Sequence, residues 1–200
     1  MFLTKDKMNL SFTPSIDIII GSVQCGKTSE IIRRLVIYHE MDMKVLYINS
    51  VLDTRSENVF STHNITIGNI PFEGVKLREL DGFDVSKYDV IAVDEAQFFR
   101  DLKENVLKWV EKMKKIVIVG GLNGDFKRDN FGRINELISY CDTITKLNSF
   151  CVLCRKRGIM KAGLFSKRVN LEDDSTVLIG GKDVYLPTCR ECFNDNNLRA

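Results

Sequence analysis

Eight consecutive residues have the composition and order of a phosphate-binding loop. Residues 21–28 read G-S-V-Q-C-G-K-T and match the pattern G-x-x-x-x-G-K-[ST] at every fixed position. In such a loop backbone N–H groups converge on phosphate oxygens, the lysine reaches the outer phosphates, and the threonine hydroxyl can ligate Mg²⁺. The residues expected to bind a nucleoside triphosphate are Gly21, Ser22, Val23, Gln24, Cys25, Gly26, Lys27 and Thr28. The alternative is a chance match on a strand, turn and helix, and the motif alone does not indicate a kinase.

An acidic pair follows an apolar run later in the chain. Asp94 and Glu95 come directly after residues 90–93 (VIAV). An acidic residue at the end of such a strand holds the Mg²⁺ shell in P-loop enzymes, so Asp94 is a candidate metal and nucleotide ligand together with Thr28. Glu95 can point away from the metal and act as general base on a substrate hydroxyl, or on water in a hydrolase. A solvated acidic turn is the ordinary alternative.

An amide and two aromatic residues follow the acidic pair. Gln97, Phe98 and Phe99 would suit a flat, hydrogen-bonding base beside a carboxylate. The alternative is that both phenylalanines belong to the core. We expect Phe99 to be a core residue and leave both possibilities open for Phe98.

Four of the six cysteines form two C-x-x-C pairs, a spacing that is typical of zinc sites. The predicted ligands of one structural zinc ion are Cys151, Cys154, Cys189 and Cys192. The 34 residues between the pairs, 155–188, are more than a usual zinc ribbon contains, so an additional loop is expected there. Unpaired or redox-active cysteines are the alternative. Cys25 and Cys141 stand apart and are predicted to be ordinary buried thiols.

Short apolar runs alternate with helical patterns over the first three quarters of the chain, which predicts an α/β fold with a mostly parallel sheet covered on both faces. The expected strands are 16–21, 44–49, 89–94, 115–120 and 142–147, and the expected helices are 27–41, 102–114 and 132–140. This pattern predicts a P-loop domain over 1–149. A small, loop-rich, zinc-binding domain is expected over 150–200.

Composition narrows the class of protein. The chain has 200 residues, of which 44% are hydrophobic and 28% charged, as in ordinary globular proteins, and its net charge is only +2. Nucleic-acid binders usually carry a concentrated basic surface, so a mononucleotide or nucleoside fits better than a polymer. No apolar segment is long enough to span a bilayer and no secretory signal is visible, so we expect a cytoplasmic protein.

Together these motifs resemble the zinc-containing thymidine kinases of bacteria, animals and large DNA viruses. The resemblance covers about residues 16–193 and rests on the phosphate-binding loop, the string 94–99 (DEAQFF) and the two C-x-x-C pairs. Further matching segments are 53–55 (DTR), 121–126 (GLNGDF), 131–132 (FG) and 179–185 (IGGKDVY). The last of these resembles the family's lasso over the nucleoside, and such a lasso would explain the long gap between the cysteine pairs.

The resemblance implies a role for each matching residue. Glu95 would take the proton of a nucleoside 5′-hydroxyl as it attacks the γ-phosphate of ATP, while Lys27 and Arg55 balance the charge. Asp94 and Thr28 would hold Mg²⁺, and Gln97 would join the nucleotide-binding set. The residues that would contact or cover the base are Val23, Phe98, Leu122, Phe126, Phe131, Ser166, Leu178, Ile179, Gly180, Gly181, Asp183 and Tyr185.

The phosphate-binding loop departs from the family's usual G-P-M-F-[AS]-G-K. Val23 stands in place of a methionine that abuts the thymine methyl group, and Gln24 in place of a phenylalanine. The residues that hold phosphate are retained, so we expect catalysis to be retained. A smaller side chain leaves space beside the base, and one methylene changes discrimination by only about 1–3 kcal/mol. The preference for thymidine is therefore expected to be looser.

The function that the resemblance implies is transfer of the γ-phosphate of ATP to thymidine, and also to deoxyuridine, in nucleotide salvage. The implied cofactors are ATP, Mg²⁺ and structural Zn²⁺. The implied partners are the nucleoside and three further copies of the chain, with no nucleic acid and no membrane. One alternative is a P-loop ATPase that is stimulated by nucleic acid and grips it with a zinc ribbon. The other is a degenerate kinase that only binds nucleotides.

Overall fold

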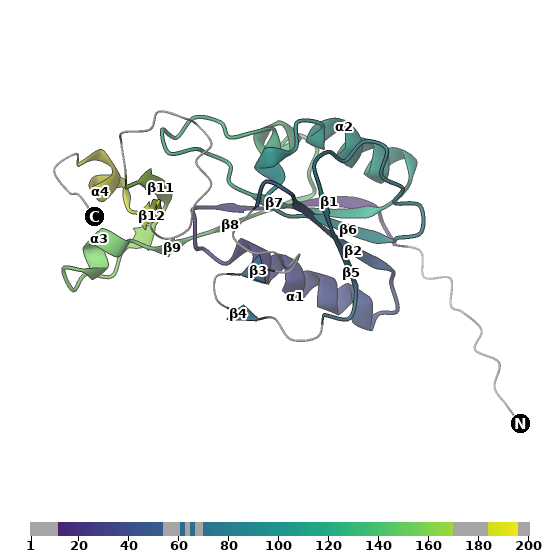
Figure 1. Ribbon diagram of the computed structural model, residues 1–200, viewed down its shortest axis with the longest axis horizontal. Coiled ribbons are helices and arrows are strands. Elements are labelled where there is room, and N and C mark those ends of the chain that lie inside the picture. The colour runs from purple at the N-terminus through teal and green to yellow at the C-terminus, as the bar shows by residue number, and fades with distance from the viewer. Residues whose placement is uncertain (1–11, 54–60, 63–64, 67–69, 170–183, 196–200) are drawn as a thin grey trace, which may run out of the picture.

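Six parallel strands form one sheet with helices on both faces in the computed structural model (Figure 1). The structure describes residues 12–53, 61–62, 65–66, 70–169 and 184–195. In chain order the strands of the sheet are β1 (Ser15–Gly21), β2 (Val45–Ser50), β5 (Glu73–Leu77), β6 (Val90–Val93), β7 (Ile116–Gly121) and β8 (Thr143–Leu147). Their order across the sheet is β5-β2-β6-β7-β1-β8. The predicted α/β class is confirmed.

The helices differ in length and type, and α1 covers one face of the sheet while α2 covers the other (Figure 1). In chain order they are α1 (Lys27–Glu40), the 3₁₀ turn η1 (Ala96–Phe98), α2 (Leu102–Leu107), the π turn η2 (Lys108–Lys112), the 3₁₀ turn η3 (Ile134–Leu137), α3 (Val152–Arg155) and α4 (Arg190–Asn194). Within the described residues, no helix combines the length and the apolar composition that crossing a membrane requires.

Short antiparallel pairs complete the fold. They are β3 (Ser61–Thr62) with β4 (Ile65–Thr66), β9 (Ser149–Phe150) with β10 (Ala162–Gly163), and β11 (Phe165–Arg168) with β12 (Tyr185–Thr188). The last two pairs lie with α3 and α4 at one end of the molecule, beyond the carboxyl ends of the sheet strands (Figure 1). They place the C-terminal part of the chain where ligands bind in open α/β sheets.

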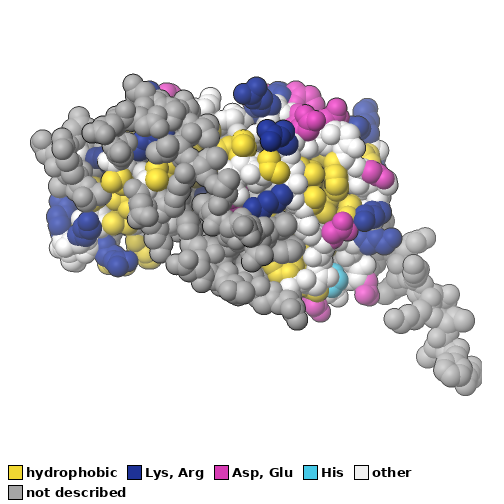
Figure 2. Space-filling view, viewed as in Figure 1, with side chains coloured by type: hydrophobic (Ala, Val, Ile, Leu, Met, Phe, Trp, Pro, Cys, Tyr) yellow, Lys and Arg dark blue, Asp and Glu magenta, His cyan; other side chains and the backbone are white. Residues whose placement is uncertain are grey.

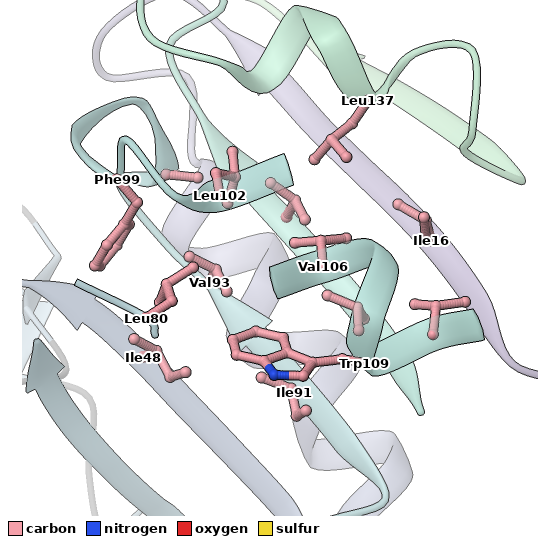
Figure 3. Packing of buried hydrophobic residues seen from close by; sticks show 14 of the residues in the cluster. Ile16, Ile48, Leu80, Ile91, Val93, Phe99, Leu102, Val106, Trp109 and Leu137 are labelled. Atoms are coloured by element: carbon pink, nitrogen blue, oxygen red, sulfur yellow. The ribbon is translucent and has the colours of Figure 1, made fainter. Parts of the chain in front are cut away.

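Alternation along the strands divides the core into two layers. Ile18 and Ile20 of β1 pack with the α2 side, whereas Ile19 between them packs with the α1 side. Figure 3 shows the α2-side layer, in which Trp109 of η2 lies against Ile91 of β6. Strands buried on both faces need apolar residues at nearly every position, which explains why the sequence shows continuous apolar runs.

The sequence located the buried strands well and the surface elements less well. Each of the five predicted strands is present, with both ends within one residue of the prediction. Strand β5 was missed because it is an edge strand with partly exposed side chains and a weak apolar pattern. The predicted helix 132–140 is wrong, since only the 3₁₀ turn η3 forms there. The predicted helix 102–114 divides into α2 and the π turn η2.

Candidate active site

The phosphate-binding loop leads from the end of β1 into the first turn of α1. Gln24 and Gly26 have left-handed backbones, with φ of 60° and 86°, and these two residues turn the loop back before α1 begins at Lys27. Glycine adopts this conformation freely, whereas for a residue with a side chain its conformational free energy is about 1–2 kcal/mol higher. The turn places the N-terminus of α1 at the loop, which is the arrangement that binds phosphate.

The Lys27 side chain is buried inside this loop. Its Nζ donates to the carbonyl oxygen of Ser22 at 2.9 Å and to that of Gly21 at 3.3 Å. Charge-assisted hydrogen bonds to anionic oxygens are stronger than those to neutral carbonyls. Phosphate oxygens could therefore replace the two carbonyl oxygens as hydrogen-bond partners of the Lys27 ammonium.

The Asp94 carboxylate joins three elements at the carboxyl ends of the strands. Its Oδ2 accepts a hydrogen bond from Thr28 Oγ1 at 2.6 Å and from Tyr47 Oη at 2.8 Å, and its Oδ1 accepts from the Glu95 backbone N–H at 2.8 Å. Burial and the charge of Glu95 raise the pKa of Asp94 to about 6, although the hydrogen bonds from Thr28 and Tyr47 lower it. A carboxylate in this state gains from a neighbouring cation.

Tyr47 is fully buried beneath this carboxylate. Burial, followed by the Asp94 charge, raises the pKa of the Tyr47 phenol well above its usual value. The phenol therefore remains protonated and acts as a fixed donor to Asp94. Thr28 and Tyr47 thus donate to the same carboxylate oxygen, Oδ2.

Glu95 has a strained backbone and a buried side chain. Its φ of 48° is left-handed, which costs about 1–2 kcal/mol for a residue with a side chain. Its Oε2 accepts from Gln97 Nε2 at 2.6 Å, and Gln97 Oε1 in turn accepts from the Leu122 backbone N–H at 3.0 Å. Strain of this kind concentrates at functional sites. Gln97 thus fixes the orientation of the carboxylate and ties it to the segment that follows β7.

Aromatic residues gather beside Gln97. The Phe98 and Phe131 rings meet edge to face, with centroids 5.9 Å apart. Gly132, with φ of 61°, lies so close to the Gln97 backbone that a Cβ would overlap the carbonyl group. Only glycine fits there, which brings Phe131 against η1. Phe98 is partly buried, while Phe99 is fully buried in the core as predicted.

Arg168 of β11 connects two further predicted base-contacting residues. Its guanidinium lies 3.9 Å from the centroid of the Phe126 ring, and its Nη2 donates to Tyr185 Oη at 2.8 Å. The side chain is buried, with 3% exposed. A planar guanidinium can stack and donate at the same time, so Arg168 holds the loop after β7 against β12.

Hydrogen bonds join the phosphate-binding loop to the C-terminal part of the chain. Ser22 Oγ donates to the Gly163 carbonyl at 2.8 Å, and the Val23 backbone N–H donates to Ser166 Oγ at 3.1 Å. Gln24 Nε2 lies 3.5 Å from the Tyr185 carbonyl, at the limit for a hydrogen bond. The nucleotide-binding loop and β10 to β12 therefore form one connected surface.

The four predicted zinc ligands converge at the far end of this C-terminal part. Cys151 and Cys189 occupy the N-cap positions of α3 and α4, and the Cys151 side chain accepts from the Cys154 backbone N–H. The four Sγ atoms all lie within 4.8 Å of one another. Cys154 Sγ is 3.7 Å from Cys189 Sγ and 3.5 Å from Cys192 Sγ. Four sulfurs that each bind one ion at about 2.3 Å lie about 3.8 Å apart, so this cluster fits a tetrahedral metal ion.

Comparison with known proteins identifies the family. Residues 14–193 match the family described as thymidine kinase. A thymidine kinase of Choristoneura biennis entomopoxvirus is 36% identical over 191 residues, which cover 92% of this chain and 98% of the viral protein. Thymidine kinase a of Arabidopsis thaliana is 35% identical over 92% of this chain and 76% of its own length. The thymidine kinase of Oryza sativa subsp. japonica is 32% identical over 94% of this chain and 69% of its own.

The chain belongs to the thymidine kinase family. It is therefore a transferase, and enzymes of this family use ATP. The resemblance that the sequence motifs indicated is confirmed.

In this member of the thymidine kinase family, many of the predicted site residues contact one another or neighbouring segments of the site. Lys27 stays within the phosphate-binding loop, whereas Thr28 reaches Asp94 and Gln97 links Glu95 to Leu122. Six predicted residues lie outside the described part of the chain: Arg55, Leu178, Ile179, Gly180, Gly181 and Asp183.

Sequence reasoning missed two side chains and misjudged two others. Tyr47 could have been noticed as a hydroxyl among the apolar residues that begin β2. Arg168 could have been noticed two residues after Ser166, on the same face of a strand. Cys25 and Cys141 were predicted to be buried but are only partly buried, since one lies on the loop and the other follows the surface turn η3.

We predict that Asp94→Asn raises the stability of the ligand-free protein more at about pH 7.5 than at about pH 4.5. The folded pKa of Asp94 is raised to about 6 from 3.8, so between these values the folded protein holds a proton that the unfolded chain has lost. The parent therefore loses up to about 2–3 kcal/mol as pH rises through this interval, and asparagine cannot ionise. Thermal unfolding at both pH values measures the difference. An equal effect of the substitution at the two pH values would contradict the raised pKa.

Proposed function

We propose that this chain transfers the γ-phosphate of ATP to the 5′-hydroxyl of thymidine, giving dTMP for nucleotide salvage and DNA precursor synthesis. The observation that carries the proposal is the Thr28–Asp94 contact of 2.6 Å beside the buried Glu95 carboxylate. A group that can hold the metal and a group that can accept a proton thus lie next to each other at the phosphate-binding loop.

Glu95 would act as the general base. Its carboxylate would accept the 5′-hydroxyl proton while the hydroxyl oxygen forms a bond to the γ-phosphorus. The bond from that phosphorus to the bridging oxygen would break, and its electron pair would leave with ADP. Gln97 would keep the Glu95 carboxylate in place through the 2.6 Å hydrogen bond.

Positive charge would balance the transferring phosphoryl group. Lys27 would exchange its carbonyl partners for phosphate oxygens, and Arg55 would approach from the segment after β2. Mg²⁺ would neutralise phosphate charge when bound, and Thr28 and Asp94 are the residues that would hold it. Both supply oxygen atoms, the ligands that Mg²⁺ prefers, and the raised pKa of Asp94 favours a cation at this carboxylate.

The nucleoside would bind between the phosphate-binding loop and the C-terminal part of the chain. Phe98, Phe131, Leu122 and Phe126 would pack the base, and Ser166 would lie near its polar edge. Val23 would face the thymine methyl group from the phosphate-binding loop. The segment Leu178, Ile179, Gly180, Gly181 and Asp183 would close over the base and lead into Tyr185. Deoxyuridine would also be accepted, because the space beside Val23 discriminates weakly.

A structural zinc ion would organise the C-terminal part. Cys151, Cys154, Cys189 and Cys192 would hold it, and four thiolates would leave no open position for catalysis. We accordingly divide the chain into a kinase domain, 1–149, and a zinc and lasso domain, 150–200. The ion would stabilise the strands that carry Ser166 and Tyr185.

A coupled ADP-release assay tests the reaction. ATP and Mg²⁺ are supplied with thymidine, deoxyuridine, deoxycytidine, deoxyguanosine or no acceptor. We expect release with thymidine and deoxyuridine. Release with other nucleosides would show that Val23 and Gln24 have altered the selectivity. Release without an acceptor would favour the ATPase alternative, and no release in zinc-loaded protein would favour a degenerate nucleotide-binding protein.

Glu95→Gln should lower kcat about 100- to 10,000-fold with little change in the affinity for ATP, because general bases contribute this much. Glutamine has nearly the same shape and can still accept from Gln97, so the substitution removes mainly the basic group. Glu111→Gln, at an exposed position of η2, is the matched control and should behave like the parent. Full activity of Glu95→Gln would exclude Glu95 as the base.

Arg168→Lys should raise the KM for thymidine about 10-fold, while the KM for ATP stays within about 2-fold of the parent. Lysine keeps the charge but cannot stack on Phe126 and donate to Tyr185 together. Steady-state kinetics with each substrate varied in turn measures the two constants. Arg155→Lys, at an exposed position of α3, is the control. Equal changes in both KM values would indicate a general disturbance rather than a role at the nucleoside side.

We also propose that the enzyme is a cytoplasmic homotetramer. Exposed apolar side chains support subunit contacts: Ile37 lies on α1, Met41 directly follows the last residue of that helix, and Ile144 lies on the edge strand β8. Light scattering of the full chain should give about four times the mass of one chain. A monomeric mass at assay concentration would contradict this part of the proposal.

A further inference from the structure

An arginine side chain contacts the cysteine cluster from outside. Arg157 Nη2 lies 3.1 Å from Cys192 Sγ and 3.5 Å from Cys154 Sγ. These two sulfurs belong to different C-x-x-C pairs, so one guanidinium reaches across both halves of the cluster. The four cysteines are buried, whereas Arg157 is exposed and lies over them.

The turn after α3 determines where Arg157 lies. The Arg157 and Ile159 backbone N–H groups both donate to the Cys154 carbonyl, at 2.9 Å and 3.0 Å. Gly158 between them has a left-handed backbone with φ of 73°, which reverses the chain. The position of Arg157 is therefore tied to the backbone of a predicted metal ligand and does not depend on a long, free loop.

We infer that Arg157 is a positioning residue of the proposed zinc site. Its guanidinium holds two of the thiolates and thereby slows loss of the metal. The inference rests on the zinc site proposed above. Four thiolates and one Zn²⁺ carry a net charge of −2, and a guanidinium beside them offsets part of it. Its N–H groups also engage the sulfur lone pairs, which would otherwise attract protons or competing metals. Partners of this kind commonly change metal affinity about 10- to 100-fold.

Other cations near the cluster do not make this contact. Figure 2 shows Lys and Arg side chains at the end of the molecule where Figure 1 places α3. Lys161 pairs with Glu191 at 2.7 Å, and Lys167 donates to the carbonyl oxygens of Cys192 and Asp195. Among the described side chains, Arg157 is the only charged one that donates to these four sulfurs. Arg155 has the same charge and is also exposed, but it does not donate to the sulfurs. Substituting Arg155 therefore distinguishes the effect of a direct hydrogen bond from the effect of a nearby positive charge.

Metal release from the full-length, zinc-loaded protein tests the inference. The parent, Arg157→Gln, Arg157→Lys and Arg155→Gln are each mixed with an excess of the chromophoric chelator 4-(2-pyridylazo)resorcinol. We expect Arg157→Gln to release zinc about 10-fold faster or more. Arg155→Gln should match the parent. Arg157→Lys should fall between them, because an ammonium keeps the charge but lacks the longer, planar guanidinium whose Nη2 contacts both sulfurs.

Cobalt substitution gives a second readout that a merely structural role would not affect. Hydrogen bonds to a thiolate lower the energy of its lone pairs, so their loss should move the sulfur-to-cobalt charge-transfer band to longer wavelength. The shift is expected in Arg157→Gln and absent in Arg155→Gln. Far-UV circular dichroism checks that each variant is folded, and Arg157→Lys carries the test if Arg157→Gln does not fold.

The outcomes separate this inference from the proposal on which it rests. A parent protein that binds neither zinc nor cobalt stoichiometrically would overturn the zinc site, and the inference with it. A parent that binds zinc, with Arg157→Gln and Arg157→Lys releasing it at the parent's rate, would overturn the role of Arg157 alone. Equal acceleration in Arg157→Gln and Arg155→Gln would also overturn it, because charge without contact would then be sufficient.

Discussion

The hydrogen bonds of the buried Asp94 carboxylate are the interaction on which the site depends. They join the end of β6 to Thr28 at the start of α1 and to Tyr47 in β2. Three segments far apart in the chain are thereby held together near the carboxyl ends of the sheet strands. The cost is a charged group in an apolar setting, which raises the pKa of Asp94. The Mg²⁺ that we propose at this carboxylate would offset the cost, because the ion would supply positive charge.

Backbone strain accompanies this arrangement. Gln24 in the phosphate-binding loop and Glu95 after β6 both have left-handed backbones without being glycine. Both residues are supported by neighbours: Gln24 reaches the Tyr185 carbonyl and Glu95 is hydrogen-bonded by Gln97. Strained residues persist only where the surrounding structure holds them, and these hydrogen bonds supply part of that support.

The C-terminal part of the chain makes direct contacts with the candidate active site. Ser22 and Val23 are hydrogen-bonded to Gly163 and Ser166, and Arg168 stacks on Phe126. The cysteine cluster lies beside the same short strands, because α3 contacts β12 and α4 contacts β11. Through these contacts the strands beside the cysteine cluster are joined to the phosphate-binding loop.

The sequence by itself determined the buried strands, the phosphate-binding loop, the acidic pair and the four-cysteine cluster. Each of these depends on residue type and spacing over a few positions, which local chemistry specifies. Only the tertiary structure decided which distant side chains meet, such as Tyr47 with Asp94, Arg168 with Phe126 and Arg157 with the sulfurs. It also decided the edge strand β5 and the shortened turn η3. Such features depend on what packs against them, and contacts between residues far apart in the chain leave no local pattern to read.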